Sequence, residues 1–492
     1  MFEGKAKIVA TMGPACRDVD VLVRMIEAGM DTARINASHA DSEVIKEEVQ
    51  ALREAASKAE KDVGIILDLM GPKIRIGDIS GGQTLLEDGD EFRLTTDPVP
   101  GGGDRVSVSY AGLPTALRPG DIVLIDDGAL RLRVEETTGT EVLCRVETGG
   151  VLSSRKGVNL PGVTLDFPTL TDKDLRDLEL GLDLDVDWIA LSFVSSGEDI
   201  AYLRRFLDKR GYDTPIVAKI EKAEAVSGLE GIVEEADAVM VARGDLGVEM
   251  PLEDIPILQK KIIESAASRA RPVITATQML QSMIVNASPT RAEVTDVANA
   301  VFDGTDAVML SGETAVGRYP VKTVETMQRI ILRTESSLPY QRWMEERRCW
   351  ISTGVVEAVC MAACELAEQT QAAAILAPTE SGFTARQVSR FHPRQAILAP
   401  TPDKRVARRL SLSWGVYPRS VGLRGGIEKI FTAAKKVAVE EGYLLPGNTV
   451  VVTAGVKIPG EEGLPTTNTI HCIKRPLEEK DEIDEGGGLH GD

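Results

Sequence analysis

The chain has 492 residues, enough for about three domains, and 76 acidic against 56 basic residues give it a net charge of −20. That charge excludes nucleic acid as a main partner, because a polyanion is attracted by Lys and Arg. Six cysteines without a CxxC pair and only four histidines exclude a disulfide framework and a His-rich metal site.

The N-terminal sequence MFEGKAKIVATMGP contains no apolar signal region. No run of about 18 apolar residues, the length that a membrane-spanning helix needs, occurs later in the chain. The sequence therefore predicts a cytoplasmic protein without a membrane partner.

Strand-like apolar runs alternate with amphipathic helical segments over residues 1–71, where the strands are KIVAT, TARINAS and GIILDLMG. The alternation stops at residue 72. Between residues 72 and 158, short strands are separated by Gly- and Asp-rich turns, which predicts an inserted β-rich lid domain. Gly and Pro at both boundaries are suited to act as hinges.

The strand–helix alternation resumes over residues 159–340 with the strands WIALSFV, PIVAKIE, AVMVARGD, PVITATQ and DAVMLSGE. Three strands before the insertion and five after it predict a (β/α)8 TIM barrel, whose active site lies at the C-terminal ends of the strands. Residues 341–476 are typical of a mostly parallel C-terminal α/β domain. Residues 477–492 form an acidic, Gly-rich tail of the kind that stays disordered.

Charged residues end two neighbouring strands of the predicted barrel. PIVAKIE carries Lys219 and Glu221 two residues apart, so both point to one face. AVMVARGD carries Arg243 and Asp245 at the same spacing. A structural ion-pair cluster is the alternative, but buried charge is costly and its recurrence favours a site. Glu221 and Asp245 suit a divalent cation, and Lys219 suits an anionic or enolate oxygen.

Polar residues end three more strands of the predicted barrel: Arg34, Asn36 and Ser38; Asp68, Lys73 and Arg75; and Thr275 and Thr277. Each alone is explained as a helix cap or a solvated charge. Together they predict a barrel mouth that binds a phosphorylated carboxylic acid with Mg²⁺. No GxxxxGK[ST] or GxGxxG motif stands in the right context, so a nucleotide here would not occupy a P-loop or a Rossmann crevice.

The chain resembles the pyruvate kinases, whose motifs TMGP, RINASH, KGVNLPG, AKIE, ARGDLG, TQML and MLSGETAVGRYP occur in order along the barrel and insertion. The resemblance implies Mg²⁺-dependent phosphoryl transfer from phosphoenolpyruvate to ADP, giving pyruvate and ATP in glycolysis, with Mn²⁺ as an alternative metal. Two other readings stay open. One is another TIM-barrel enzyme acting on phosphoenolpyruvate or an enolate, and the other is a non-catalytic homologue.

The resemblance also implies roles for single residues. Glu221 and Asp245 would bind Mg²⁺, Lys219 would stabilise charge on the transferring phosphoryl group and the enolate oxygen, and Arg34 would contact the phosphoryl group. The substrate carboxylate would be held by the N–H groups of Gly244 and Asp245 and by the Thr277 hydroxyl. The expected nucleotide contacts are Pro14, Asn36, His39, Arg75 and Lys156, with the insertion as a lid that excludes water.

The family's K⁺ ligands match Asn36, Ser38, Asp68 and the carbonyl of Leu69. Many members have D-T-K-G-P-E-I-R where this chain has DLMGPKIR, so Lys73 replaces a Glu near that site and Met70 replaces a Lys. An ammonium group there would supply the charge of K⁺, which predicts activity that does not require K⁺. The alternative is that Lys73 points to water and the K⁺ site is intact.

The C-terminal domain contains a Ser- and Thr-rich loop, Thr379–Thr384, before a predicted helix. Thr379, Ser381, Gly382 and Thr384 resemble the family's sugar-phosphate effector site, because hydroxyls and free N–H groups at a helix N-terminus bind phosphate. Arg424 and the GVKIPGEEGLPTTNT segment would complete this site. Ordinary helix capping is the alternative. The resemblance implies a homotetramer regulated by a phosphorylated effector.

Overall fold

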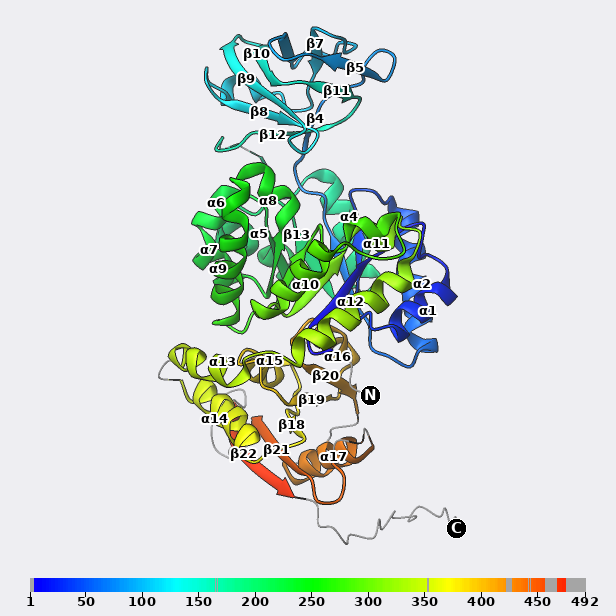
Figure 1. The fold of residues 1–492 in the computed structure, drawn as a ribbon, viewed down its shortest axis with the longest axis vertical. Helices are drawn as coiled ribbons and strands as arrows, with labels where there is room; N and C mark the ends of the chain where they lie inside the picture. Colours follow the sequence, from blue (N-terminus) through cyan, green and yellow to red (C-terminus); the bar gives the residue numbers. More distant parts are fainter. Residues whose placement is uncertain are drawn as a thin grey trace. The chain divides into compact units, whose positions relative to one another are not determined.

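The computed structural model describes residues 4–163, 165, 167–351, 354–421, 427–440, 442, 444–455 and 467–474. The chain divides into two compact units, Met1–Leu338 with Ser411–Trp414, and Pro339–Leu410 with Gly415–Asp492. The first unit contains a barrel and an inserted β-rich lid, and the second is an α/β domain (Figure 1). Across the described part of the chain, none of the helices combines the length and apolar character needed to cross a membrane.

Eight parallel strands close into a barrel in the order β1-β17-β16-β15-β14-β13-β3-β2. They are β1 (Lys7–Thr11), β2 (Thr32–Asn36), β3 (Gly64–Asp68), β13 (Trp188–Leu191), β14 (Ile216–Ile220), β15 (Ala238–Ala242), β16 (Val273–Ala276) and β17 (Ala307–Leu310). All but β2 are buried throughout, because helices cover the outside of the barrel and side chains fill its interior. The predicted (β/α)8 barrel is confirmed, with each of the eight expected strands in place.

The helices of this unit are α1 (Val19–Glu27), α2 (Ser42–Lys58), α4 (Asp172–Asp183), α5 (Gly197–Asp208), α6 (Ala223–Ser227), α7 (Leu229–Glu235), α8 (Arg243–Glu249), η1 (Leu252–Asp254), α9 (Ile255–Ala267), η2 (Gln281–Ile284), α10 (Arg291–Phe302), α11 (Gly312–Ala315) and α12 (Pro320–Glu335). Side chains cap the N-termini of several of these helices. Asp18 and Asp41 accept backbone N–H groups at the starts of α1 and α2, and Thr171 and Thr290 form capping boxes.

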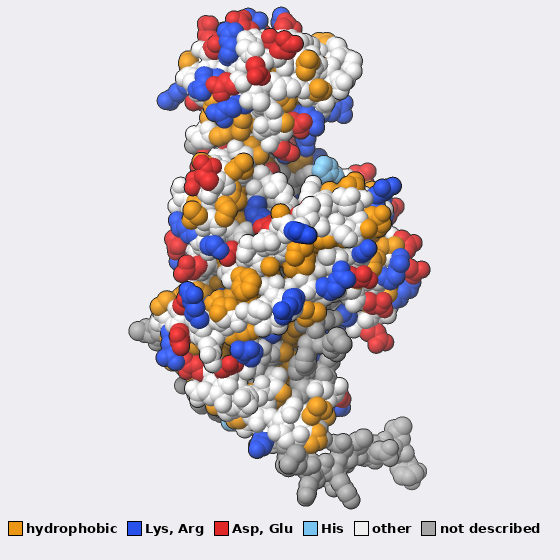
Figure 2. Space-filling view, in the orientation of Figure 1, with side chains coloured by type: hydrophobic (Ala, Val, Ile, Leu, Met, Phe, Trp, Pro, Cys, Tyr) orange, Lys and Arg blue, Asp and Glu red, His pale blue; other side chains and the backbone are white. Residues whose placement is uncertain are grey.

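The lid has a seven-stranded sheet, β4-β12-β8-β9-β10-β6-β7, and a two-stranded sheet, β11-β5. Its elements are β4 (Ile74–Arg75), β5 (Gln83–Leu86), β6 (Glu91–Thr95), β7 (Arg105–Ser107), α3 (Leu113–Ala116), β8 (Ile122–Ile125), β9 (Leu130–Thr137), β10 (Glu141–Thr148), β11 (Gly150–Ser153) and β12 (Gly157–Asn159). Buried apolar side chains form its own core. Charged side chains of both signs are mixed over the face of the lid that Figure 2 shows. Arg145, for example, pairs with Glu91 and Glu135.

The second unit has a five-stranded sheet in the order β20-β19-β18-β21-β22, parallel except for the β21–β22 pair. Its elements are α13 (Tyr340–Glu346), η3 (Arg347–Trp350), α14 (Val355–Gln369), β18 (Ala374–Leu376), α15 (Phe383–Ser389), β19 (Ala396–Thr401), α16 (Lys404–Leu410), β20 (Val416–Ser420), α17 (Ile427–Glu440), β21 (Thr449–Gly455) and β22 (Thr467–Lys474). Separate apolar clusters cover the two faces of the sheet. The predicted mostly parallel α/β domain is confirmed. The tail, Arg424 and most of the GVKIPGEEGLPTTNT segment lie outside the described residues.

Candidate active site

Lys219 lies near the C-terminal end of β14, where its buried ammonium group contacts three oxygen-bearing side chains. Its Nζ is 2.8 Å from Oε1 of Glu221 and 3.1 Å from Oδ1 of Asp68, and it donates a hydrogen bond of 2.6 Å to Oγ of Ser192. Burial would lower the pKa of Lys219, but Asp68 and Glu221 outweigh it and raise the pKa above its usual value. The side chain is therefore a fixed cation.

Asp68, at the end of β3, joins Lys219 to Arg34 of the neighbouring strand β2. Nε of Arg34 is 2.6 Å from Oδ2 of Asp68, and its Nη1 donates to Oγ1 of Thr11 at 3.2 Å. Burial alone would raise the pKa of Asp68, but Lys219 and Arg34 hold it below its usual range. An ionised carboxylate thus fixes two cations, one from β2 and one from β14, in the barrel mouth.

Glu221 and Asp245 lie near each other on the same side of the mouth. Burial is the main cause that raises the pKa of Glu221; Lys219 opposes the rise, and the negative charge of Asp245 adds to it. Oε2 of Glu221 also accepts the Phe193 N–H at 2.7 Å. Two neighbouring carboxylates fit Mg²⁺, which usually takes one or two protein carboxylates and completes its ligands with water and phosphate oxygens. Among the described residues, no three His, Cys, Asp or Glu side chains group as a dedicated metal cage.

These side chains open into a cavity of about 360 Å³ between the barrel and the lid. Its lining comprises Arg34, Asn36, Ser38, His39, Met70, Lys73, Arg75, Asp126, Asp127, Lys156, Gly157, Ser192, Phe193, Lys219, Glu221 and Asp245. Most of the residues singled out from the sequence are thus brought together. Pro14 is exposed on the loop after β1 and does not line this cavity.

Basic side chains gather around His39 in the lining of the cavity. Burial lowers the pKa of His39, and the positive charges of Arg75, Arg34 and Lys73 lower it further. Lys156 adds a cation from the lid, where its Nζ is 2.9 Å from Oδ1 of Asp126. This part of the cavity is suited to bind phosphate groups, because several cationic side chains line it.

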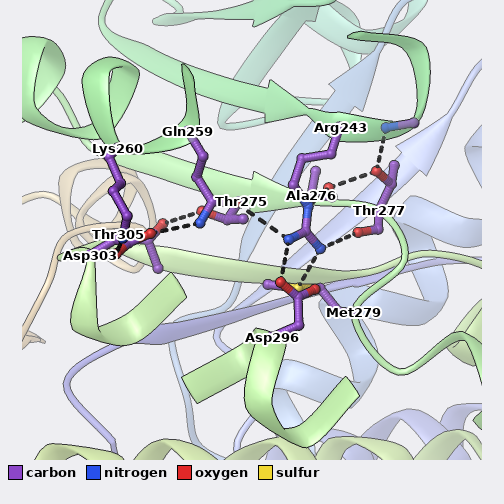
Figure 3. Close-up of polar contacts among 11 residues, drawn as sticks. Arg243, Gln259, Lys260, Thr275, Ala276, Thr277, Met279, Asp296, Asp303 and Thr305 are labelled. Carbon is purple, nitrogen blue, oxygen red and sulfur yellow. Dashed lines mark hydrogen bonds and ion pairs between the residues drawn. The ribbon is translucent and has the colours of Figure 1, made fainter. Parts of the chain in front are cut away.

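Arg243 and Asp245 occupy the first turn of α8, since β15 ends at Ala242. The expectation that they share a strand face is wrong, because the chain turns into a helix at Arg243. The guanidinium of Arg243 is not part of the cavity lining, and it donates to five acceptors (Figure 3). They are Oδ1 of Asp296 at 2.7 Å, Oε1 of Gln259 at 3.3 Å, the carbonyls of Ala276 at 3.2 Å and Thr277 at 2.6 Å, and Sδ of Met279 at 3.0 Å.

Arg243 thereby holds the turn after β16, where Thr277 and Gln278 have positive φ values of 66° and 55°. Such a backbone is strained for residues with side chains and persists where the surroundings enforce it. The Thr277 hydroxyl accepts the Gly244 N–H at 2.8 Å, so the turn is tied to α8 from both sides. Thr275, the other threonine singled out on this strand, is not part of the turn. Its buried hydroxyl forms a hydrogen bond of 2.9 Å with the hydroxyl of Thr305.

Lys73 lies against the last strand of the lid. A Cβ built on Gly157 would be 2.8 Å from its Cε and 3.5 Å from its Nζ. The described ion pairs include none between Lys73 and Asp68, whose partners are Arg34 and Lys219. At the expected K⁺ ligands, Oδ1 of Asn36 accepts the Ser38 N–H at 3.2 Å, and the carbonyl of Leu69 accepts the Ser192 hydroxyl at 2.7 Å.

Ser192 was missed by the sequence reading although it contacts Lys219, Asp68 and Leu69. A polar residue at the C-terminal end of a barrel strand is the pattern that identified the other site residues. Ser192 fits this pattern, because it directly follows β13. Asp126 and Asp127 were missed because they lie in the lid, at a turn with φ values of 57° and 52°. Only the placement of the lid brings that turn to the cavity.

In the second unit, the Thr379–Thr384 segment leads into the seven-residue helix α15 and includes its first two residues, Phe383 and Thr384. Oγ1 of Thr379 accepts the Gly382 N–H at 2.9 Å, and Gly382 has a φ of 81°. Thr379 and Thr384 are buried, whereas Ser381 is exposed. The Thr379 bond is of the kind expected from ordinary loop capping.

Comparisons with known proteins agree over nearly the whole chain. The profile of the pyruvate kinase barrel domain matches residues 3–324, and that of the pyruvate kinase alpha/beta domain matches residues 357–473. The chain is 45% identical to pyruvate kinase 2 of Synechocystis sp. over 96% of this chain and 80% of that protein. It is 44% identical to the pyruvate kinase of Corynebacterium glutamicum over 96% and 97%.

A crystal structure of a pyruvate kinase from Cryptosporidium parvum superposes with a TM-score of 0.91 at 37% identity, covering 96% of both chains. At such identity and coverage the likeness extends beyond the barrel fold, which many unrelated enzymes share. The chain belongs to the pyruvate kinase family.

Proposed function

We propose that this protein is an active pyruvate kinase that transfers the phosphoryl group of phosphoenolpyruvate to ADP, giving pyruvate and ATP. The observation that carries the proposal is the Lys219 cluster, in which a buried cation contacts Asp68 and Glu221 beside a cavity of about 360 Å³. Phosphoryl transfer depends mainly on positioning and on charges placed before the reaction, and this arrangement supplies both.

Three groups of the barrel act on the substrate in this proposal. Lys219 stabilises negative charge on the transferring phosphoryl group and on the enolate oxygen. Arg34, held by Asp68 at 2.6 Å, contacts the phosphoryl group. The N–H groups of Gly244 and Asp245 and the Thr277 hydroxyl hold the carboxylate. The Gly244 N–H donates to the Thr277 hydroxyl, and that hydroxyl donates to the Ala276 carbonyl, so both donors exchange these partners for the carboxylate when substrate binds.

Glu221 and Asp245 are the proposed ligands of Mg²⁺, with Mn²⁺ as an alternative. When bound, the ion neutralises charge on the substrate oxygens. Glu221 is oriented for this by the Phe193 N–H. Burial is the main cause that raises the pKa of Glu221 and the charge of Asp245 adds to it, so a bound cation would offset the repulsion between the two carboxylates.

The lid closes over the nucleotide in this proposal and keeps water from the reacting phosphate. The nucleotide contacts are Asn36, His39, Arg75 and Lys156, all of which line the cavity. Pro14, the fifth expected contact, belongs to the proposal through the TMGP motif alone, because it lies outside the lining.

Independence from K⁺ belongs to the same proposal. Lys73 brings an ammonium group to the lining of the cavity that also contains Asn36 and Ser38. Its aliphatic chain lies along Gly157, so the charge is held near the hinge of the lid. The remaining expected K⁺ ligands, Asp68 and the Leu69 carbonyl, are already engaged by protein donors.

Regulation and assembly are proposed from family membership. A phosphorylated effector would bind Thr379, Ser381, Gly382 and Thr384, and the protein would be a cytoplasmic homotetramer without nucleic-acid or membrane partners. The proposed domains are a barrel of residues 1–71 and 159–340, a lid of residues 72–158, a regulatory domain of residues 341–476 and a tail of residues 477–492.

One assay tests the function. Purified protein is incubated with phosphoenolpyruvate, ADP and Mg²⁺, and pyruvate and ATP are measured together. Equal amounts of the two products support the proposal. Pyruvate without ATP would instead favour another enzyme that acts on phosphoenolpyruvate. No product from the folded protein, with candidate phosphosugars and AMP also present, would favour a non-catalytic homologue.

A further inference from the structure

One buried carboxylate contacts the chain both where it leaves the barrel for the lid and where it has returned. Oδ1 of Asp174 accepts the N–H of Gly71, the last residue before the lid, at 3.0 Å. Its Oδ2 accepts the N–H of Thr171 at 2.9 Å and the Thr171 hydroxyl at 2.6 Å. Thr171 is the N-cap of α4, the first helix after the lid. Asp174 is 0% exposed, so these donors satisfy both oxygens of a carboxylate that water does not reach.

The bond from Asp174 holds Gly71 in a crowded place beside the cavity. Gly71 has a φ of 67°, and a Cβ built on it would be 2.9 Å from Cδ2 of Phe193 and 3.0 Å from Cβ of Ser192. Both of these residues line the cavity, as does Lys73, two residues after Gly71. A bond that fixes the Gly71 N–H therefore fixes the segment from which Lys73 reaches the cavity.

Lys173, the residue before this carboxylate in α4, contacts a second segment of the cavity wall. Its Nζ donates to the carbonyl of Ala37 at 2.7 Å and to that of Ala40 at 3.5 Å. The two residues between these carbonyls, Ser38 and His39, both line the cavity. The ammonium group of Lys173 therefore spans the loop after β2 and limits the positions that His39 can take.

An ion pair keeps Lys173 in this place. Its Nζ pairs with Oδ2 of Asp177, one turn further along α4, and the Asp177 side chain is buried. The flexible lysine side chain is thus held at its end by a carboxylate of its own helix. Lys173 and Asp174 are adjacent in the sequence, so the first turn of α4 fixes both the loop after β2 and the segment that enters the lid.

We propose that Lys173 and Asp174 are positioning residues for the nucleotide side of the site. The inference rests on the proposed function, in which His39 and residues of the lid contact ADP. Because both segments are fixed before the nucleotide arrives, ADP binds without the entropy loss of ordering them. Neither residue lines the cavity, so each acts on ADP only through the backbone that it holds.

Calorimetry tests the proposal without turnover. The Kd of ADP is measured with Mg²⁺, and so is the Kd of oxalate, a dicarboxylate that resembles the enolate of pyruvate and probes the barrel side of the site. Asp174→Ala and Lys173→Met should each weaken ADP binding by about 10-fold, which equals about 1.4 kcal/mol. The Kd of oxalate should change by less than about 2-fold, as expected for a separate group of contacts.

Matched controls separate positioning from helix stability. Thr171→Ala removes the hydroxyl that caps α4 but leaves the bond from Gly71 to Asp174, so it should lower the melting temperature and leave the Kd of ADP unchanged. Arg176→Met removes an exposed cation of the same helix and should change neither value. Lys173→Arg should keep most of the ADP affinity, because a guanidinium still donates to a carbonyl.

Hydrogen–deuterium exchange followed by mass spectrometry locates the effect of each substitution. Asp174→Ala should speed exchange in peptides that contain Gly71, because its N–H loses the carboxylate. Lys173→Met should speed exchange in peptides that contain Ser38 and His39. Exchange at the present rate in both places would show that these contacts do not hold the two segments.

Unchanged ADP affinity in both variants, or an equal loss of ADP and oxalate affinity, overturns the proposal. An effect of Thr171→Ala on ADP as large as that of Asp174→Ala would also overturn it, because capping alone would then explain the result. Lys173 is partly exposed, so Lys173→Met still decides the question if Asp174→Ala does not fold. Failure to form pyruvate would overturn the proposed function, whereas the two Kd values would still decide the positioning roles.

Discussion

The Nζ of Lys219 lies 2.8 Å from Oε1 of Glu221, so the cation proposed to stabilise the phosphoryl group directly contacts a proposed metal ligand. Lys219 lies in β14 and Glu221 directly follows that strand, and both side chains are buried. Each therefore sets the charge and the orientation of the other before substrate binds. Such preorganisation removes part of the reorganisation that the reaction would otherwise require.

Lys219→Ala should lower kcat by about 10²–10³-fold, the usual effect of losing one preorganised charge donor. The rate of pyruvate formation at saturating phosphoenolpyruvate, ADP and Mg²⁺ measures it. Lys209→Ala is the control, because Lys209 is exposed at the end of α5. Near-normal turnover of the Lys219 variant would contradict the assigned role.

Glu221→Gln should raise the Mg²⁺ concentration for half-maximal activity by at least about 10-fold, because an amide is a weaker ligand for a hard cation than a carboxylate. Direct titration with Mn²⁺, followed by its electron paramagnetic resonance signal, checks binding apart from activity. The matched change Glu198→Gln affects an exposed acid of α5 and should alter neither value. Unchanged Mn²⁺ affinity in Glu221→Gln would place the metal elsewhere.

The protein should be fully active in buffer free of K⁺, and Lys73→Glu should make its activity depend on K⁺. The reason is that the substitution removes an ammonium group from the cavity lining and introduces a carboxylate that K⁺ can neutralise. Pyruvate formation is followed before and after addition of KCl, with NaCl as the salt control. Activity of the unsubstituted protein that begins only after KCl is added would mean that Lys73 does not replace the ion.

Arg243→Lys should lower kcat/KM for phosphoenolpyruvate by about 10²-fold while leaving the charge in place. A lysine cannot reproduce a guanidinium that donates to five acceptors, and each lost bond is worth about 1 kcal/mol. Steady-state kinetics checks it, with Arg269→Lys as the control at an exposed position. A variant with normal kinetics would show that the turn at Thr277 keeps its conformation without the guanidinium.

A thiol reagent at pH 8 should modify two of the six cysteines quickly, Cys349 and Cys472, which are exposed. Burial raises the pKa of Cys16 to about 11 and that of Cys144 and Cys360 to about 12, so almost none of their thiolate exists at that pH. Burial likewise raises the pKa of Cys364 well above its usual value. Mass spectrometry after brief labelling checks the count, and all six should react in denaturant. Rapid native labelling of a buried thiol would contradict this.

The barrel strands and most residues of the cavity could be predicted from the sequence, because both depend on local patterns. Apolar runs bounded by Gly and Pro locate the strands, and the C-terminal ends of parallel strands meet at one mouth. Lys219 and Glu221 meet at the C-terminal end of β14, where residues two apart in extended chain point to one side. These relations need no knowledge of how distant segments pack.

Tertiary structure alone decided where side chains outside the strand pattern point. Arg243 turns to Asp296 and the Thr277 carbonyl because the chain becomes helical at that residue. Lys73 lies along Gly157 because the hinge brings together segments about 84 residues apart, a separation that no local periodicity encodes. The sequence by itself determined the mouth and its charged residues. Long-range packing decided which of these residues face the cavity, because a side chain's neighbours depend on the segments folded against it.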